Sequence, residues 1–261
     1  MKENKLRSYV IFTTQRTGST WLCDILYNHK NIKSYTELFR INPDVDYPRF
    51  AHTDLVLYER FLKSASLLNK LFFKEYLYRE YLKKITSKTE TADQYLSVGF
   101  KLMYSQEQRN KGLWKYLTKN TDKFIHLKRR NLLERAISKV YMESTGIAHA
   151  NEFDSDTESK PKGSLNVKKV LNELKKDILE SKAIANKIAT LPKDKIITIY
   201  YEDLNENLES TLKELYIFLE VPFQVHSSSF KKLINETPRE YVLNYDAIES
   251  TAANAGLLDC F

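Results

Sequence analysis

Hydrophobic residues near the N-terminus change from a continuous run to a helical spacing across one short polar segment. Residues 10–12 are β-branched or aromatic, which is typical of a buried strand in a parallel sheet. Residues 13–20 are polar, and apolar side chains return at helical spacing over residues 21–26. This pattern predicts a strand, a tight polar turn and a helix.

Similar changes of pattern recur along the chain. Further strands are expected at 97–104, 124–127 and 196–204, the last one passing into a turn. Helical spacing of apolar residues recurs at 54–85, 133–141, 171–188, 208–219 and in a closing segment at 244–261. The alternation predicts a P-loop-like, three-layer α/β fold with a central parallel sheet flanked by helices.

Two segments are expected to differ from this plan. Residues 42–95 predict a helical insertion: a loop at 42–49, one or two amphipathic helices at 54–85 whose aromatic residues belong to the core, and a polar linker at 88–94. Residues 151–164 are acidic and polar and contain Gly and Pro, so we expect a mobile loop. A lid ordered by ligand and a disordered segment without function both fit this composition.

Composition limits the class of protein. With 261 residues, 42% of them hydrophobic, the chain is expected to form one domain over 1–261. Its two cysteines, Cys23 and Cys260, indicate no disulfide framework, and no run approaches the about 18 apolar residues of a membrane span. We therefore expect a cytoplasmic protein or a chain trimmed from a longer one. The net charge of +7 is spread along the chain, which disfavours a nucleic-acid partner.

The polar turn after the first strand has the composition of an anion site. Backbone N–H groups in the first turn of a helix lack intrahelical acceptors and attract anions. Gly18 allows close approach of a ligand, Ser19 and Thr20 offer hydroxyl groups, and Arg16 offers a guanidinium. The expected ligand is a phosphate or a sulfate, although a tight turn with an incidental Arg has the same pattern. A Walker A loop is excluded because no Lys follows the glycine.

A second basic segment lies at the end of a predicted strand. Arg130 is expected where strand 124–127 ends, and Ser138 about two turns into the following helix. An Arg guanidinium forms bidentate bonds to phosphate. A basic turn between a strand and a helix without a ligand has the same pattern.

Three parts of the chain, in order, resemble sulfotransferases. Residues 16–21 resemble the loop that binds the 5′-phosphosulfate of 3′-phosphoadenosine 5′-phosphosulfate (PAPS), and residues 130–138 resemble the motif for its 3′-phosphate. Residues 201–222 resemble the family's Tyr-Glu-Asp-Leu to Val-Pro block, whose Tyr lies near the adenine. The resemblance covers about residues 9–245. It implies a cofactor site formed by Arg16, Thr17, Gly18, Ser19, Thr20, Trp21, Arg130, Ser138 and Tyr201.

The resemblance also implies a catalytic base. In bacterial trehalose-type and glycosaminoglycan-type sulfotransferases a Glu after the first helix takes the acceptor proton, and Glu37 is the matching residue; a surface Glu on a strand or turn is the alternative. Small-molecule sulfotransferases place a Lys and then a catalytic His on the next strand. Here Lys101 is present, but Met103 replaces the His, so the base assignment moves to Glu37. Lys101 is expected to face the crevice at the strand ends.

Other matches to the family are incomplete. His149 follows a Thr-Gly segment in which Ala148 replaces a Trp, and the Arg-Lys-Gly cofactor loop of small-molecule enzymes is missing. Lys231 or Lys232 could take over the function of that loop. The insertion at 42–95 corresponds to the part that shapes the acceptor pocket in relatives.

The resemblance implies sulfuryl transfer from PAPS to a hydroxyl of a carbohydrate or glycolipid, with release of 3′,5′-ADP. Arg16, Lys101 and Glu37 are the expected catalytic residues, no metal is required, and the chain could form a homodimer. A P-loop-like kinase would need a loop Lys that is missing here. A non-catalytic module that binds nucleotides or polyanions would keep Arg16 and Arg130 and have no need of Glu37.

Overall fold

The computed structural model describes the chain except for residues 1–5, 42–56, 91–93, 147–159, 226–236 and 259–261. It divides into two compact units, one of residues 1–128 with 191–226 and the other of residues 129–190 with 227–261. Each unit has a hydrophobic core of its own. Whether the two behave as a single domain stays a prediction.

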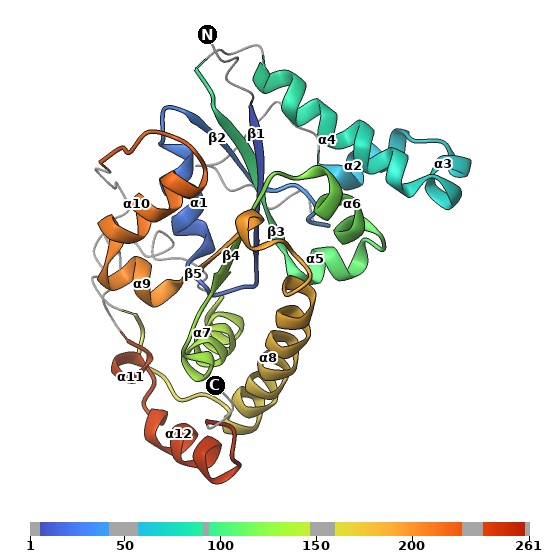
Figure 1. The fold of residues 1–261 in the computed structure, drawn as a ribbon. Helices are drawn as coiled ribbons and strands as arrows, with labels where there is room; N and C mark the ends of the chain where they lie inside the picture. Colours follow the sequence, from blue (N-terminus) through green and yellow to red (C-terminus); the bar gives the residue numbers. More distant parts are fainter. Residues whose placement is uncertain (1–5, 42–56, 91–93, 147–159, 226–236, 259–261) are drawn as a thin grey trace. The chain divides into compact units, whose positions relative to one another are not determined.

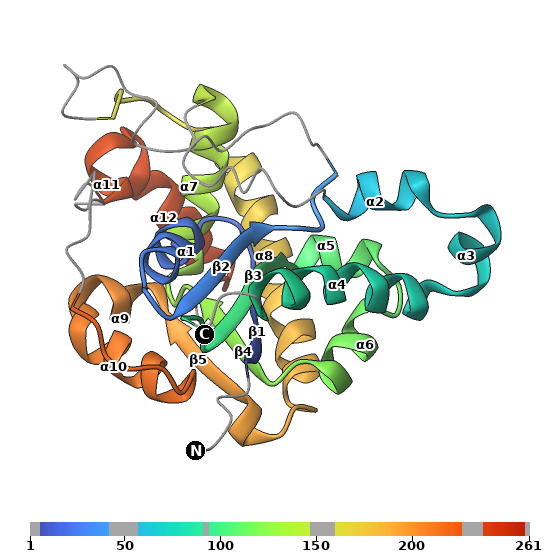
Figure 2. The same ribbon diagram turned by 90° about the horizontal axis from the view of Figure 1, so that it is seen from above.

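A five-stranded parallel sheet forms the centre of the first unit (Figures 1 and 2). Its strands are β1 (Arg7–Thr13), β2 (Ile32–Glu37), β3 (Ser97–Met103), β4 (Lys123–Lys128) and β5 (Ile196–Tyr200), in the order β2-β3-β1-β4-β5. All neighbouring pairs are parallel. Four strands match the sequence prediction closely. The fifth, β2, was not predicted, because this edge strand carries only two large apolar side chains, Ile32 and Tyr35.

The helices of the first unit are α1 (Ser19–Tyr27), α2 (Tyr58–Ser64), α3 (Leu67–Phe72), α4 (Lys74–Glu90), α5 (Tyr104–Arg109), α6 (Leu113–Asn120), α9 (Tyr201–Glu206), α10 (Leu208–Phe218) and the 3₁₀ helix η3 (Lys193–Lys195). Side chains alternate across the sheet. Tyr9 and Ile11 pack in one core with α1 and α10. On the other face the Phe12 ring lies 4.7 Å from the rings of Tyr104 in α5 and Trp114 in α6. This arrangement confirms the predicted three layers.

The second unit is helical: α7 (Leu132–Thr145), α8 (Val167–Ile188), α11 (Pro238–Tyr241) and α12 (Tyr245–Asn254). Apolar residues of all four helices form its core. Gly163 forms an isolated bridge to Val242, in which its N–H donates to the Tyr241 carbonyl and its own carbonyl accepts from Leu243 N–H, both at 3.0 Å. The predicted mobile loop therefore ends in a fixed segment at residues 160–164. Its residues 151–159 lie outside the described part of the chain.

The helical insertion differs from the prediction in number and in orientation. It contains three described helices, α2, α3 and α4, where one or two were expected. Tyr58 is buried as predicted, but Phe72 and Tyr76 are exposed. The core positions of α4 are Leu77, Tyr78 and Tyr81. The number differs because the chain breaks twice, at Ala65 and at Phe73, and the spacing of apolar residues alone does not mark these breaks.

Several boundaries also needed correction. The polar residues assigned to a linker at 88–94 continue α4 as far as Glu90, because Lys and Glu are good helix formers. The strand expected to end at Tyr104 ends at Met103, and the turn expected after β5 is the short helix α9. The loop predicted at 42–49 lies outside the described residues.

His126 of β4 is a buried core histidine. Its Nε2 is 2.7 Å from the Tyr104 hydroxyl, and burial, assisted by the charge of Lys128, lowers the pKa of the ring to about 3. The unfolded chain therefore binds more protons than the folded chain between about pH 3 and pH 6.5. Protonation of this histidine in the unfolded chain therefore lowers the free energy of unfolding as the pH falls from about 6.5 to about 3. Above pH 6.5 this loss of stability is absent.

We predict that lowering the pH from 7.5 to 5 reduces the free energy of unfolding by about 2 kcal/mol more in the wild type than in His126→Gln. Urea unfolding at both pH values measures the difference, and other titrating groups cancel between the two proteins. An equal pH dependence in the two proteins would show that His126 does not carry this effect.

Candidate active site

The loop between β1 and α1 has an unusual backbone. Arg16 and Gly18 have positive φ angles of 62° and 75°, and they lie on either side of Thr17. Neighbouring residues of alternating right- and left-handed conformation turn their N–H groups toward one side and can form an anion-binding concavity. Thr17 Oγ1 donates to the Thr14 carbonyl at 2.9 Å and lies 2.7 Å from the Thr13 hydroxyl. The Thr17 side chain is buried and supports the loop from inside. Its place in the cofactor site stays a prediction.

The support of the loop extends to the neighbouring strand. Thr13 Oγ1 donates to the carbonyl of Leu127 in β4 at 2.9 Å. Because β1 and β4 are paired at this level of the sheet, the bond fixes the end of β1 where the chain turns. The loop is thus held by hydroxyl groups of Thr13 and Thr17.

Helix α1 begins directly after this loop. Its first intrahelical bond runs from Leu22 N–H to the Gly18 carbonyl at 3.0 Å, so the N–H groups of Ser19, Thr20 and Trp21 have no acceptor within the helix. The Trp21 side chain packs against the core of the first unit. The group of Trp21 that can bind the predicted ligand is therefore its backbone N–H.

Tyr201 is in direct contact with the loop. It is the first residue of α9, and its ring lies so close to Gly18 that a Cβ atom added there would be 2.6 Å from Tyr201 Cδ2. Gly18 is therefore required twice, by its positive φ and by the ring beside it. The structure brings together two residues that the sequence assigned to one site from motifs more than 180 positions apart.

Glu37, Lys101 and Gln106 form a polar cluster at the carboxyl end of the sheet. Glu37 Oε1 is 3.0 Å from Lys101 Nζ, and Gln106 Nε2 donates to Glu37 Oε2 at 2.6 Å. Lys101 is buried, and the side chain of Glu37 keeps 16% of its exposure. Each carboxylate oxygen thus has one partner, which fixes the orientation of the group while part of it remains accessible. The alternative of an ordinary surface Glu does not fit this environment.

A β-bulge places Glu37 beside Lys101. Tyr35 pairs with Phe100 and Glu37 pairs with Lys101, so Thr36 is an extra residue in β2. Without the bulge, Thr36 would oppose Lys101 in the register. Because alternate residues of a strand point to opposite faces, Glu37 would then point away from the lysine. The bulge therefore determines which side chain reaches the lysine.

Cys23 of α1 lies under this cluster and is inert. Burial raises the pKa of its thiol to about 11, and the charge of Lys101 only partly offsets that effect. A thiol with this pKa is protonated at neutral pH and is not a nucleophile. The carboxylate of Glu37 is therefore the group of this cluster that can accept a proton from a substrate.

The predicted 3′-phosphate residues belong to the second unit. Arg130 is exposed and follows the end of β4 by two residues, and Ser138 lies on the buried side of α7. Asn131 caps α7 by accepting from Glu134 N–H at 2.9 Å. The structure places both residues on elements of the predicted kind. Their use together with residues 16–21 remains a prediction.

Two nearby basic side chains are occupied in this unit. Arg135 forms a buried ion pair with Asp177 of α8, and Lys139 pairs with Glu173 of the same helix. Burial raises the pKa of Asp177 to about 7 in spite of the opposing effect of Arg135. Both cations join α7 to α8, on either side of Ser138 in the sequence.

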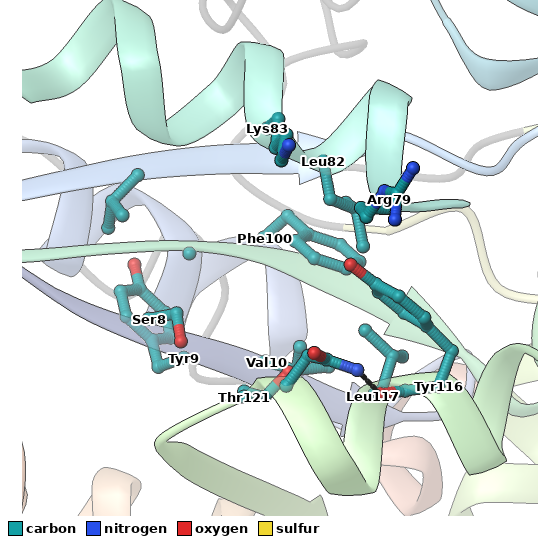
Figure 3. Close-up of a pocket in the computed structure, with 13 residues that line it drawn as sticks. Ser8, Tyr9, Val10, Arg79, Leu82, Lys83, Phe100, Tyr116, Leu117 and Thr121 are labelled. Carbon is teal, nitrogen blue, oxygen red and sulfur yellow. Dashed lines mark hydrogen bonds between the residues drawn. The ribbon is translucent and has the colours of Figure 1, made fainter. Parts of the chain in front are cut away.

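A cavity of about 300 Å³ lies on the opposite face of the sheet (Figure 3). It is lined by Val10 and Phe100 of the strands, by Arg79 of α4 and by Tyr116 of α6. Lys101 follows Phe100 on β3 and therefore points to the other face. The sheet separates this cavity from the Glu37 cluster, so the cavity is not the candidate active site.

Some predicted features could not be located. His149, Lys231, Lys232 and Cys260 lie outside the described residues. The described side chains include no group of three or more His, Cys, Asp and Glu placed to share a metal ion. No described helix has both the length and the apolar character needed to cross a bilayer.

Sequence reasoning missed Gln106 and the function of Thr13. Gln106 is in α5, whose sequence matches no motif, and its contact with Glu37 depends on a bulge that no residue pattern announces. Thr13 could have been suspected, because a polar residue at the end of a buried strand needs a hydrogen-bond partner.

The whole chain was compared with known proteins. The profile of the sulfotransferase family matches residues 9–225. The sulfotransferase domain from the curacin biosynthetic pathway is 15% identical, with 96% of this chain and 99% of that chain covered and a TM-score of 0.50. A sulfotransferase from Alicyclobacillus acidocaldarius is 13% identical, with 98% and 94% covered and a TM-score of 0.50. No curated protein matches significantly. At this identity the two structures show a common fold, which confirms the P-loop-like prediction.

Gly18 and Gly112 provide a matched pair for testing the contact with Tyr201. Both are N-cap residues with positive φ, but nothing lies within 4 Å of a Cβ at Gly112. Gly112→Ala should reduce the free energy of unfolding by about 1–2 kcal/mol, and Gly18→Ala by at least about 1 kcal/mol more, because the Tyr201 ring must move. Urea unfolding measures both. In a Tyr201→Ala background the two costs should become equal; equal costs with Tyr201 present would contradict the contact.

Proposed function

Because this chain belongs to the sulfotransferase family, we propose that it transfers a sulfuryl group from PAPS to a hydroxyl of a carbohydrate or glycolipid and releases 3′,5′-ADP. The observation that carries the proposal is the backbone of residues 16–21, which combines two positive φ angles with the N-terminus of α1. Such a site binds a compact anion through N–H groups alone. It suits the 5′-phosphosulfate of the donor.

The residues of the loop fit the donor in chemistry as well as in shape. PAPS would supply the activated sulfuryl group. The N–H groups of Ser19, Thr20 and Trp21, with the guanidinium of Arg16, would stabilise negative charge that develops on the bridging and sulfuryl oxygens. The ring of Tyr201 packs on Gly18 and would form a wall for the adenine. Arg130 and Ser138 would hold the 3′-phosphate.

The position of Glu37 supports its role as the base. In the order β2-β3-β1, β3 separates the strand of Glu37 from the strand that ends in the loop. Two strand spacings amount to about 10 Å, which leaves room for an acceptor hydroxyl beside the carboxylate. Lys101 and Gln106 hold the carboxylate in place. Glu37 would take the hydroxyl proton as the acceptor oxygen bonds to sulfur, and Lys101 would stabilise charge near the transferred group.

The acceptor class is the least constrained part of the proposal. The bacterial carbohydrate sulfotransferases that the sequence resembles use a Glu base, and the Glu37 cluster is consistent with that chemistry. A hydroxyl acceptor of small-molecule or glycan type follows from it. Homodimer formation, a cytoplasmic location and the lack of a nucleic-acid partner remain predictions from composition and from the resemblance.

Replacing the proposed base tests the catalytic part. Glu37→Gln keeps the size of the side chain and removes its ability to accept a proton, so kcat for sulfate transfer should fall about 10²-fold or more. Binding of 3′,5′-ADP, measured by calorimetry, should change by less than about threefold, because the ligand is bound elsewhere in the site. Exposed Glu209 of α10 provides the control, Glu209→Gln, with unchanged kcat. Unchanged kcat in Glu37→Gln would remove Glu37 as the base.

The 3′-phosphate assignment has a separate test. Arg130→Ala should weaken the binding of 3′,5′-ADP about tenfold or more and leave 5′-AMP binding nearly unchanged, because only the first nucleotide carries a 3′-phosphate. Arg129→Ala is the matched control, since the Arg129 guanidinium is already 2.6 Å from Glu134. Equal losses for the two nucleotides would contradict the assignment. In that case Arg130 would contribute only general positive charge.

A further inference from the structure

Large apolar side chains are exposed together on the helical insertion. The exposed residues are Leu67 at 71%, Leu68 at 66%, Phe72 at 72%, Phe73 at 55% and Tyr76 at 42%. They lie within ten consecutive residues, on α3, at the junction residue Phe73 and at the start of α4. Scattered exposed apolar residues are common in proteins, but a cluster of this size on one short segment indicates a binding surface. We call these five residues the apolar patch.

The patch lies at the outer end of an arm. In Figures 1 and 2 the helices α2, α3 and α4 extend away from the sheet, and α3 lies farthest from it. The part of α4 that reaches the core uses Leu77, Tyr78 and Tyr81, none of which belongs to the patch. The patch is therefore not needed for the core of this unit. Because it lies at a protruding end, it suits a broad surface better than a partner that would enter a groove.

Positive charge surrounds the patch. Residues 61–79 contain four basic residues, Lys63, Lys70, Lys74 and Arg79, against one acidic residue, Glu75. Within the described part of the chain, no ion pair is formed by the three lysines. The Arg79 guanidinium lies 5.1 Å from the centre of the Tyr76 ring. Residues 61–79 thus combine Leu and Phe side chains with a net charge of +3, counted as four minus one.

We propose that this arm binds to an anionic lipid surface. Leu, Phe and Tyr side chains enter the boundary between headgroups and acyl chains, and Lys and Arg are attracted by anionic lipids. A second copy of the chain fits less well, because a two-fold contact through the patch would bring two segments of charge +3 together. The proposal does not depend on the sulfotransferase reaction, and its failure would leave that reaction unaffected.

Vesicle binding of the full chain is the direct test. The wild type is mixed with vesicles of phosphatidylcholine alone, or of phosphatidylcholine with phosphatidylglycerol, and the bound fraction is measured by flotation. Binding to the anionic vesicles should be at least about tenfold stronger and should weaken with salt, because several basic residues contribute. Equal binding to both kinds of vesicle, or no binding to either, would overturn the proposal.

Matched variants separate the patch from other exposed residues. Phe72→Ser with Phe73→Ser should weaken binding to anionic vesicles about tenfold or more, whereas Leu179→Ser with Ile217→Ser, at positions that are each 69% exposed on other helices, should have no effect. Lys70→Glu with Lys74→Glu should weaken binding about 20-fold or more. Its control is Lys175→Glu with Lys213→Glu. Equal losses in the variants and their controls would overturn the proposal, as would a change of molecular mass by light scattering with no change in vesicle binding.

Discussion

The turn that follows β1 is the constraint on which the candidate site depends. The chain passes from a buried strand to a helix over residues 14–18, and it does so with two left-handed residues, Arg16 and Gly18. The hydroxyl groups of Thr13 and Thr17 stabilise this backbone. They lie within hydrogen-bond distance of each other, and Thr13 donates to the Leu127 carbonyl. The N–H groups of Ser19, Thr20 and Trp21 in the first turn of α1 have no acceptor within the helix, so the candidate anion site lies at this turn.

The rest of the site is built relative to that turn. Tyr201 begins α9 and packs its ring on Gly18, which connects the loop to the strand at the other end of the order, β5. On the opposite side a bulge at Thr36 brings Glu37 beside Lys101. The Glu37 carboxylate is held by Lys101 and Gln106, and one strand, β3, separates its strand from the strand that ends in the loop. This arrangement suits the transfer of a group from an anionic donor to a hydroxyl.

Much of this could be predicted from the sequence, for reasons that particular residues show. Buried strands and the polar turn at 13–20 leave strong patterns, so the parallel sheet and the loop were found. Edge strand β2 has too few apolar residues to be recognised, and the bulge at Thr36 and the contact with Gln106 arise only from pairing between strands. The insertion was misread because exposed and buried apolar residues have the same spacing in a sequence, and Phe72 looks no different from Tyr81.

The position of bound nucleotide tests the central claim most directly. In a crystal structure with 3′,5′-ADP, the account predicts that the 5′-phosphate lies within about 3.2 Å of the N–H groups of Ser19 and Thr20. The same structure should show the adenine beside Tyr201 and the 3′-phosphate at Arg130. A nucleotide bound on the other face of the sheet, at Arg79 and Tyr116, or no nucleotide at all, would contradict it.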